Sequence, residues 1–132
     1  MRLLVLGQAK DFPTDHPGYH DGFLRLLSEN ELDAYSYLSY FHLINQYGWD
    51  GLWGEVKKQA IEMSADALFL HFFHHDNNDP TWYIQELKSL PGKPIIFTSL
   101  GDPFGLWFNR IPSGYLKASS LADVNFLTGM GY

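Results

Sequence analysis

The chain of 132 residues is long enough for one domain with a single core and short for a complete two-domain enzyme. Without cysteine it has neither a disulfide framework nor a thiolate metal site, and a formal charge of -6 with scattered lysines makes nucleic acid an unexpected partner. The first apolar run is too short for a signal peptide or an integral membrane segment, so we expect a cytoplasmic protein.

The amino-terminal region predicts a strand, a loop and a helix. Residues 3–6 form a continuous apolar run that Gly7 closes, which is typical of a central parallel strand followed by a tight turn. A polar loop with two prolines then extends over residues 8–18. Apolar residues recur at helical spacing after this loop, at Tyr19, Phe23, Leu26 and Leu27.

Residues 33–41 are ambiguous, because their aromatic side chains favour a strand but also suit a loop that packs its rings. Residues 49–64 predict a helix that covers one side of the sheet. Its apolar positions follow a single helical face, at Trp49, Leu52, Trp53, Val56, Ala60 and Met63.

A third strand is predicted over residues 67–73, and a polar cluster at residues 74–79 ends it. Asp79 and Pro80 then predict a helix start, because the carboxylate caps free amides and proline needs no amide hydrogen there. This helix continues to a stop at residues 91–92.

Residues 93–99 predict a fourth strand, residues 113–123 a short helix and residues 124–128 a fifth strand. A short internal similarity links residues 65–70 to residues 122–127, and both copies lie where a helix leads into a strand. We interpret them as equivalent joints rather than as a repeat.

The alternation of strands and helices predicts an α/β fold, a Rossmann-like three-layer α/β/α sandwich with a mostly parallel sheet of about five strands. Residues 1–132 form one such domain. The last strand is not followed by a helix, whereas a buried parallel strand needs layers on both sides. We expect either a longer natural chain, a homo-oligomer or another partner to cover that edge.

Open α/β sheets bind ligands at the carboxyl ends of their strands, and histidines gather at two such places. His71 and His74 lie at the end of the third strand, and His16 and His20 flank the end of the first loop. A histidine there suits general acid or base work, or a hydrogen bond to a substrate hydroxyl. Each is equally well explained as a satisfied polar residue of a loop.

A metal site is not expected at the third strand's end. His71, His74, His75 and Asp76 include zinc ligand types, but adjacent strand residues point to opposite faces. No His-Glu-x-x-His helix is present.

The loop after the first strand has neither a Gly-x-Gly-x-x-Gly pattern nor a Walker lysine motif. Gly18 and Gly22 near the helix start would let backbone amides face an anion, although a structural turn explains them better. We expect no cofactor.

Asp102 follows the fourth strand and precedes a proline. Its carboxylate is placed to bind a sugar hydroxyl or accept a proton, and Gly-Asp-Pro is equally ordinary turn chemistry. Phe104 and Trp107 follow directly. Rings beside a polar strand end suit sugar docking, or they belong to the core.

Together these segments resemble the amino-terminal half of GT-B-fold glycosyltransferases, especially those of the spore-maturation type. The resemblance covers nearly the whole chain. It rests on the apolar first strand and on the patterns at residues 16–20, 69–74, 95–103 and 119–128.

The resemblance implies two facing Rossmann-like domains, of which the first mainly holds the acceptor and the second mainly the nucleotide-sugar donor, with no metal needed for catalysis. It places His71 or His74 near the transferred sugar. These two histidines are one residue further apart than those of the His-x-His strand end of the family. Asp102 would lie near the same centre, and the acceptor would contact His16, Gly18, His20, Phe104 and Trp107. The second domain is not in these residues, so this chain alone is not expected to transfer a hexosyl group.

Two alternatives stay open. One is a non-catalytic flavodoxin-like binding or signalling module, although residues 7–9 lack the acids of a phosphoreceiver and no flavin phosphate loop is present. The other is a protein-interaction domain, because aromatic residues make up 17% of the chain and exposed tryptophans would dock a partner.

Overall fold

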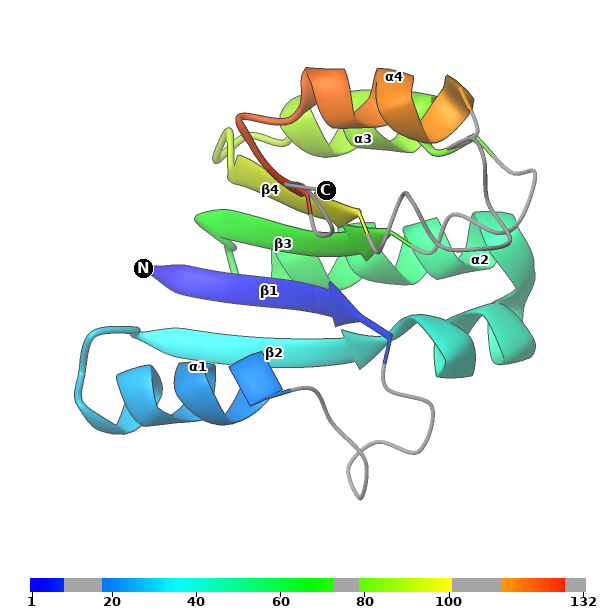
Figure 1. Cartoon of the computed structure of the whole chain (residues 1–132). Helices are drawn as coiled ribbons and strands as arrows, with labels where there is room; N and C mark the ends of the chain where they lie inside the picture. Colours follow the sequence, from blue (N-terminus) through cyan, green and yellow to red (C-terminus); the bar gives the residue numbers. More distant parts are fainter. Residues whose placement is uncertain (9–17, 73–78, 101–112, 128–132) are drawn as a thin grey trace.

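The sheet of this protein has five strands that all run parallel, in the order β2-β1-β3-β4-β5 (Figure 1). The structure, a computed structural model, describes residues 1–8, 18–72, 79–100 and 113–127. The strands are β1 Arg2–Gly7, β2 Ala34–Ser39, β3 Ala67–Phe72, β4 Ile95–Leu100 and β5 Val124–Leu127. The predicted Rossmann-like α/β fold is therefore confirmed.

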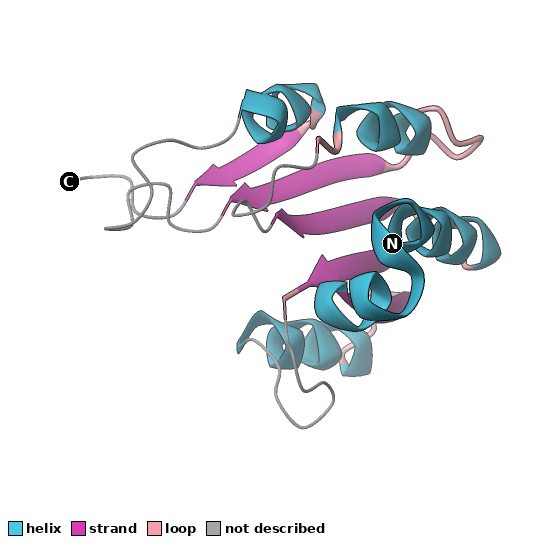
Figure 2. Cartoon of the chain, turned by 90° about the vertical axis from the view of Figure 1, so that its right-hand side faces the viewer, coloured by secondary structure: helices cyan, strands magenta, loops and turns pink. Residues whose placement is uncertain are grey.

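Four helices connect the described strands and cover the two faces of the sheet unequally. They are α1 Gly18–Ser28, α2 Tyr40–Glu62, α3 Thr81–Lys88 and α4 Ser113–Leu121. Side chains of α2, α3 and α4 pack on one face, which we call the three-helix face. The α1 helix packs on the opposite face, which we call the α1 face. Figure 2 shows the strands between these helices.

The larger core lies on the three-helix face. Alternate strand residues point to it because strand side chains alternate between faces. Leu68 and Leu70 of β3 are fully buried there, against Leu52 and Val56 of α2 and Ile84 of α3. Each such side chain contributes about 1.5–3 kcal/mol through burial.

The α1 face has a smaller core. Leu3 and Val5 of β1 are buried there with Ala67 of β3, and Phe23 of α1 packs against them. This second core lies mainly over β1 and β2, because α1 contacts β2.

The ambiguous segment at residues 33–41 contains β2 and the start of α2, which begins at Tyr40 and not at Trp49 as expected. The Ser39 side chain accepts a hydrogen bond from the His42 backbone N–H at 3.4 Å and so caps the helix start. Gly48 has a φ of 75°, which kinks the helix. Because the apolar periodicity restarts after this kink, the sequence predicted only the part from Trp49 onward.

The predicted start of α3 is confirmed. Asp79 Oδ1 accepts a hydrogen bond from the Thr81 backbone N–H at 2.9 Å, and the Pro80 carbonyl accepts one from the Ile84 N–H at 3.0 Å. Hydrogen bonds from the side chain and the backbone N–H of Thr81 to the Asp79 carboxylate lower the pKa of Asp79 below its usual value.

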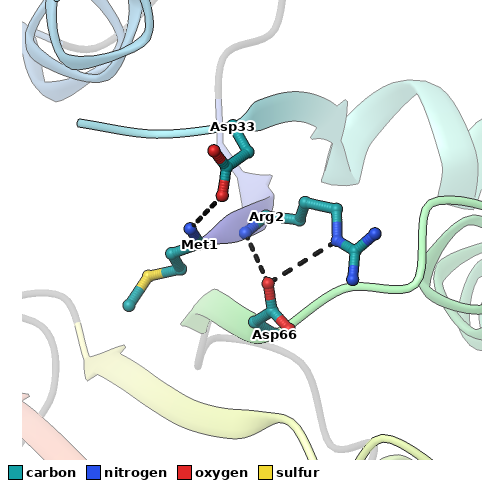
Figure 3. Close-up of polar contacts among 4 residues, drawn as sticks. All are labelled: Met1, Arg2, Asp33 and Asp66. Atoms are coloured by element: carbon teal, nitrogen blue, oxygen red, sulfur yellow. Dashed lines mark hydrogen bonds and ion pairs between the residues drawn. The ribbon is translucent and has the colours of Figure 1, made fainter. Parts of the chain in front are cut away.

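The two similar helix-to-strand joints make the same contacts. Asp66 Oδ2 accepts from the Arg2 backbone N–H at 2.8 Å, and the Asp66 N–H donates to the Arg2 carbonyl at 2.9 Å (Figure 3). Asp123 Oδ2 accepts from the Ile96 N–H at 2.8 Å, and its own N–H donates to the Ile96 carbonyl at 2.9 Å. Each aspartate thus fixes the register of its strand against the neighbouring strand.

A third joint of this kind precedes β2, and the sequence similarity did not reveal it. The Asp33 N–H donates to the Met1 carbonyl at 3.0 Å, and Asp33 Oδ2 pairs with the Met1 amine at 2.6 Å (Figure 3). The hydrogen bond and charge of that amine lower the pKa of Asp33. Aspartates therefore fasten the amino-terminal edge of the sheet at three places.

Candidate functional site

The strand order places a topological switch point between β1 and β3, since the chain proceeds from β1 toward β2 on one side and from β3 toward β5 on the other. Ligands of open α/β sheets bind outside the carboxyl ends of the strands at such a point. Here β1 ends at Gly7, and His71 lies one residue before the end of β3. The candidate site is therefore the carboxyl end of these two strands on the α1 face.

His71 is half-buried beneath the first turn of α1. The Tyr19 hydroxyl lies 3.4 Å from His71 Nδ1, and the Tyr19 ring meets the Phe69 ring edge-on with centroids 5.5 Å apart. Burial lowers the pKa of His71 below its ordinary value of 6.5. His71 is therefore neutral at physiological pH, with one ring nitrogen that donates and one that accepts.

Tyr19 is surrounded by other polar rings. Burial is the main cause that raises the pKa of Tyr19, and a hydrogen bond with Tyr37 and the proximity of Tyr35 raise it further. Burial also raises the pKa of Tyr35. These phenols stay protonated at neutral pH, so they serve as hydrogen-bond donors and acceptors rather than as bases or nucleophiles.

Gly7 allows the Tyr37 ring to lie against the end of β1. A Cβ atom at Gly7 would overlap the ring of Tyr37, with Cε2 only 2.6 Å away. Any side chain larger than hydrogen would displace Tyr37 from its place beside Tyr19. The tight turn predicted at Gly7 thus coincides with a close approach of a side chain to the backbone.

His20 is buried between α1 and β2, with 8% of its surface exposed. Its Nδ1 lies 2.7 Å from the Tyr35 hydroxyl, and its ring meets the Tyr37 ring edge-on at 5.2 Å. These contacts are those of a structural histidine that holds the tyrosines in place. We call the set of Tyr19, His20, Tyr35, Tyr37 and His71 the tyrosine–histidine cluster.

Other predicted site residues are placed only in part. Gly18 is the first residue of α1. Five further candidates lie outside the described residues, namely His16, His74, Asp102, Phe104 and Trp107. The strands before two of them are neighbours, because Phe72 at the end of β3 pairs with Leu100 at the end of β4. Their roles stay predictions.

The described residues contain no group of three or more His, Asp or Glu side chains that could hold a metal ion. His74, His75 and Asp76 of the predicted cluster lie outside these residues. The expectation that no metal binds there remains untested.

The sequence did not identify the tyrosines as site residues. Tyr19 served only as an apolar position of the helix, and the segment containing Tyr35 and Tyr37 was ambiguous. One available signal was the alternation of Tyr35 and Tyr37, which places two hydroxyl groups on the same face of one strand.

The tryptophans divide between core and surface. Trp53 is buried and stacks on Tyr83 with centroids 5.5 Å apart and planes at 11°. Trp82 is exposed over 60% of its surface. The aromatic content therefore supplies both a bulky core and exposed rings.

Comparisons with protein-family models, with curated proteins and with solved structures each found no match. Within residues 1–8, 18–72, 79–100 and 113–127, no helix combines the length and the apolar character that crossing a membrane requires.

Proposed function

We propose that this chain is the acceptor-side domain of a glycosyltransferase and that its tyrosine–histidine cluster binds a hydroxyl group of the acceptor. The observation that carries the proposal is the neutral His71 beside the Tyr19 hydroxyl at the β1–β3 switch point. The substrate class comes from the sequence resemblance to GT-B-fold enzymes.

A neutral imidazole suits this role because one ring nitrogen accepts a proton or a hydrogen bond from an attacking hydroxyl. Tyr19 would orient that hydroxyl by donating a hydrogen bond to it, because the Tyr19 phenol keeps its proton at neutral pH. His74 and Asp102, which follow β3 and β4, are proposed to act at the same centre, with His16, Phe104 and Trp107 as acceptor contacts. A second domain would bring the nucleotide-sugar donor.

The test is a titration of the chain and its variants with methyl glycosides of glucose, galactose and N-acetylglucosamine, followed by NMR through the backbone amide signals of α1 and β3. We expect saturable shifts, and an at least tenfold weaker affinity in His71→Gln or Tyr19→Phe, because one hydrogen bond to the ligand is lost. The matched control is Trp82→Ala, which removes an exposed ring remote from the cluster and should leave the affinity unchanged.

The proposal is wrong if no glycoside binds at up to about 10 mM, a range that covers weak sites. It is equally wrong if Trp82→Ala abolishes binding while His71→Gln does not, because the sugar would then stack on a surface ring.

The alternative, a non-catalytic flavodoxin-like binding or interaction module, is favoured by a specific observation. The strand order 2-1-3-4-5 is that of flavodoxin-like proteins. Since one fold serves many functions, this order does not decide between the two. Binding of proteins but not of glycosides would select the alternative.

A further inference from the structure

A groove runs along the α1 face beside α1 and over β3, β4 and β5. Its volume is about 410 Å³, and apolar side chains line it. Phe69, Phe97 and Phe126 form the floor, Phe23 and Leu26 of α1 form one wall, and Met1 closes one end. We call it the β5 groove.

The floor of the β5 groove is a continuous row of rings from three neighbouring strands. Phe97 and Phe126 are stacked, with centroids 6.5 Å apart and planes at 16°. Phe69 lies 6.3 Å from Phe126 and also 6.3 Å from Phe23 on α1. The residue of β5 that precedes Phe126, Asn125, accepts a hydrogen bond from Thr98 and so faces the opposite side.

The β5 end of this row is unusually exposed for a parallel sheet, whereas Phe69 and Phe97 are half-buried. Phe126 is exposed over 50% of its surface and Val124, on the same face of β5, over 38%. Parallel sheets are almost always covered by helices on both faces. Among the described helices only α1 lies on this face, where Phe23 and Tyr19 contact Phe69 of β3. Within the described residues no helix packs on Val124 and Phe126 of β5 there.

The width of the groove floor matches one helix. Three parallel strands at their usual spacing span about 10 Å, which is also about the diameter of a helix with its side chains. A helix packed beside α1 at the usual axial distance of about 8–10 Å would lie directly over Phe69, Phe97 and Phe126.

Charge determines which helix fits. Two ion pairs involve residues beside the lining of the groove, the Met1 amine with Asp33 at 2.6 Å and Arg25 with Glu29 at 2.9 Å. The chain as a whole carries -6, so a second copy would bring like charges together, whereas a basic partner would be attracted.

From the exposed Phe126 ring, the width of the apolar groove beside it and the net charge, we propose that the β5 groove binds an amphipathic α-helix of a partner protein. The apolar face of this helix covers Phe69, Phe97 and Phe126, and its polar face is rich in lysine or arginine. This inference does not depend on the proposed sugar site, which lies at the carboxyl end of β1 and β3.

The test joins a probe helix to residue 132 through a flexible linker of about ten residues, which raises its local concentration to the millimolar range. The probe has about sixteen residues, with leucine at helical spacing and lysine elsewhere. We expect the melting temperature of the chain to rise by about 5 °C or more. A second fusion, with the same residues in an order that breaks the helical spacing, should give no rise.

Three variants of the fused protein locate the contact. Phe126→Asp and Leu26→Asp place a charge in the groove from two different elements and should each abolish the rise. Ile61→Asp is the matched control, because Ile61 is exposed over 54% of its surface but lies on α2, and it should keep the rise.

The proposal is overturned if the probe helix gives no rise, if the rearranged probe gives the same rise, or if neither groove variant reduces it. It is also overturned if the unfused chain forms a dimer in sedimentation experiments and Phe126→Asp dissociates that dimer, because a second copy would then be the occupant.

Discussion

The two faces of the sheet are built from the same strands but differ in how they are covered. On the three-helix face, Leu68 and Ile96 are fully buried under helices that follow β2, β3 and β4. On the α1 face, Leu3 and Val5 of β1 are buried, whereas Phe126 of β5 is half exposed. Apolar strand residues such as Leu68 thus contribute to stability through burial on the three-helix face. Phe126, on the α1 face, is equally apolar but keeps half of its surface in water.

The largest expected contrast compares one residue from each face. Leu68→Ala should lower the free energy of unfolding by about 2–5 kcal/mol, because it opens a cavity in a fully packed core. Phe126→Ala should lower it by less than about 1.5 kcal/mol, because half of its ring is already in water. Urea unfolding of both variants measures the difference. Equal losses would show that Phe126 is covered in solution, and the contrast between the faces would then be wrong.

A smaller effect tests the covered part of the α1 face. Gly7→Ala should lower the free energy of unfolding by about 1–3 kcal/mol, because the new methyl group overlaps Tyr37. Gly22→Ala is the matched control: nothing lies within 4 Å of its Cβ position inside α1, so the change should stabilise the protein by about 0.5–1 kcal/mol.

The combination of Gly7→Ala with Tyr37→Ala distinguishes a steric cause from a backbone cause. If the Tyr37 ring is the obstacle, the double variant should lose less than the sum of the two single variants. Additive losses would place the defect in the backbone of β1 instead.

The smallest expected effect is a pH dependence. Burial lowers the pKa of His71 below 6.5 in the folded state, so the unfolded chain binds more protons as the pH falls below that value. The free energy of unfolding should therefore decrease from pH 7.5 to pH 5, and His71→Gln should reduce this decrease. Asp33 and Asp79 do not interfere, because their lowered pKa values place their titration below pH 3.8. An unchanged pH profile in His71→Gln would mean that His71 is not desolvated.

Local signals predicted a large part of this fold. Short, mainly apolar runs at residues 3–6 and 67–73 identified buried strands, because four to seven residues between polar turns is the usual length of a strand and too short for a helix. The Asp79 and Pro80 pair identified the start of α3 for a reason that the hydrogen bond to Thr81 confirms. The similarity around Asp66 and Asp123 identified two joints whose backbone contacts are the same.

The candidate site was predicted less well, because its contacts join residues far apart in the chain. His71 was named from its position at a strand end, whereas its neighbour Tyr19, which comes 52 residues earlier, was not. The start of α2 was missed for a related reason. A glycine adopts a positive φ in turns as well as in kinked helices, so the sequence alone does not show that Gly48 lies inside α2.

The amino-acid sequence by itself determined the alternation of strands and helices, the parallel sheet and the position of His71 at the carboxyl end of β3. These follow from periodicity, capping and turn chemistry, which act over a few residues. Only the tertiary structure decided which side chains meet beneath α1 and that Phe69, Phe97 and Phe126 form a row whose β5 end is exposed. Such contacts depend on strand order and on the face that each helix covers, which are properties of the whole packed chain.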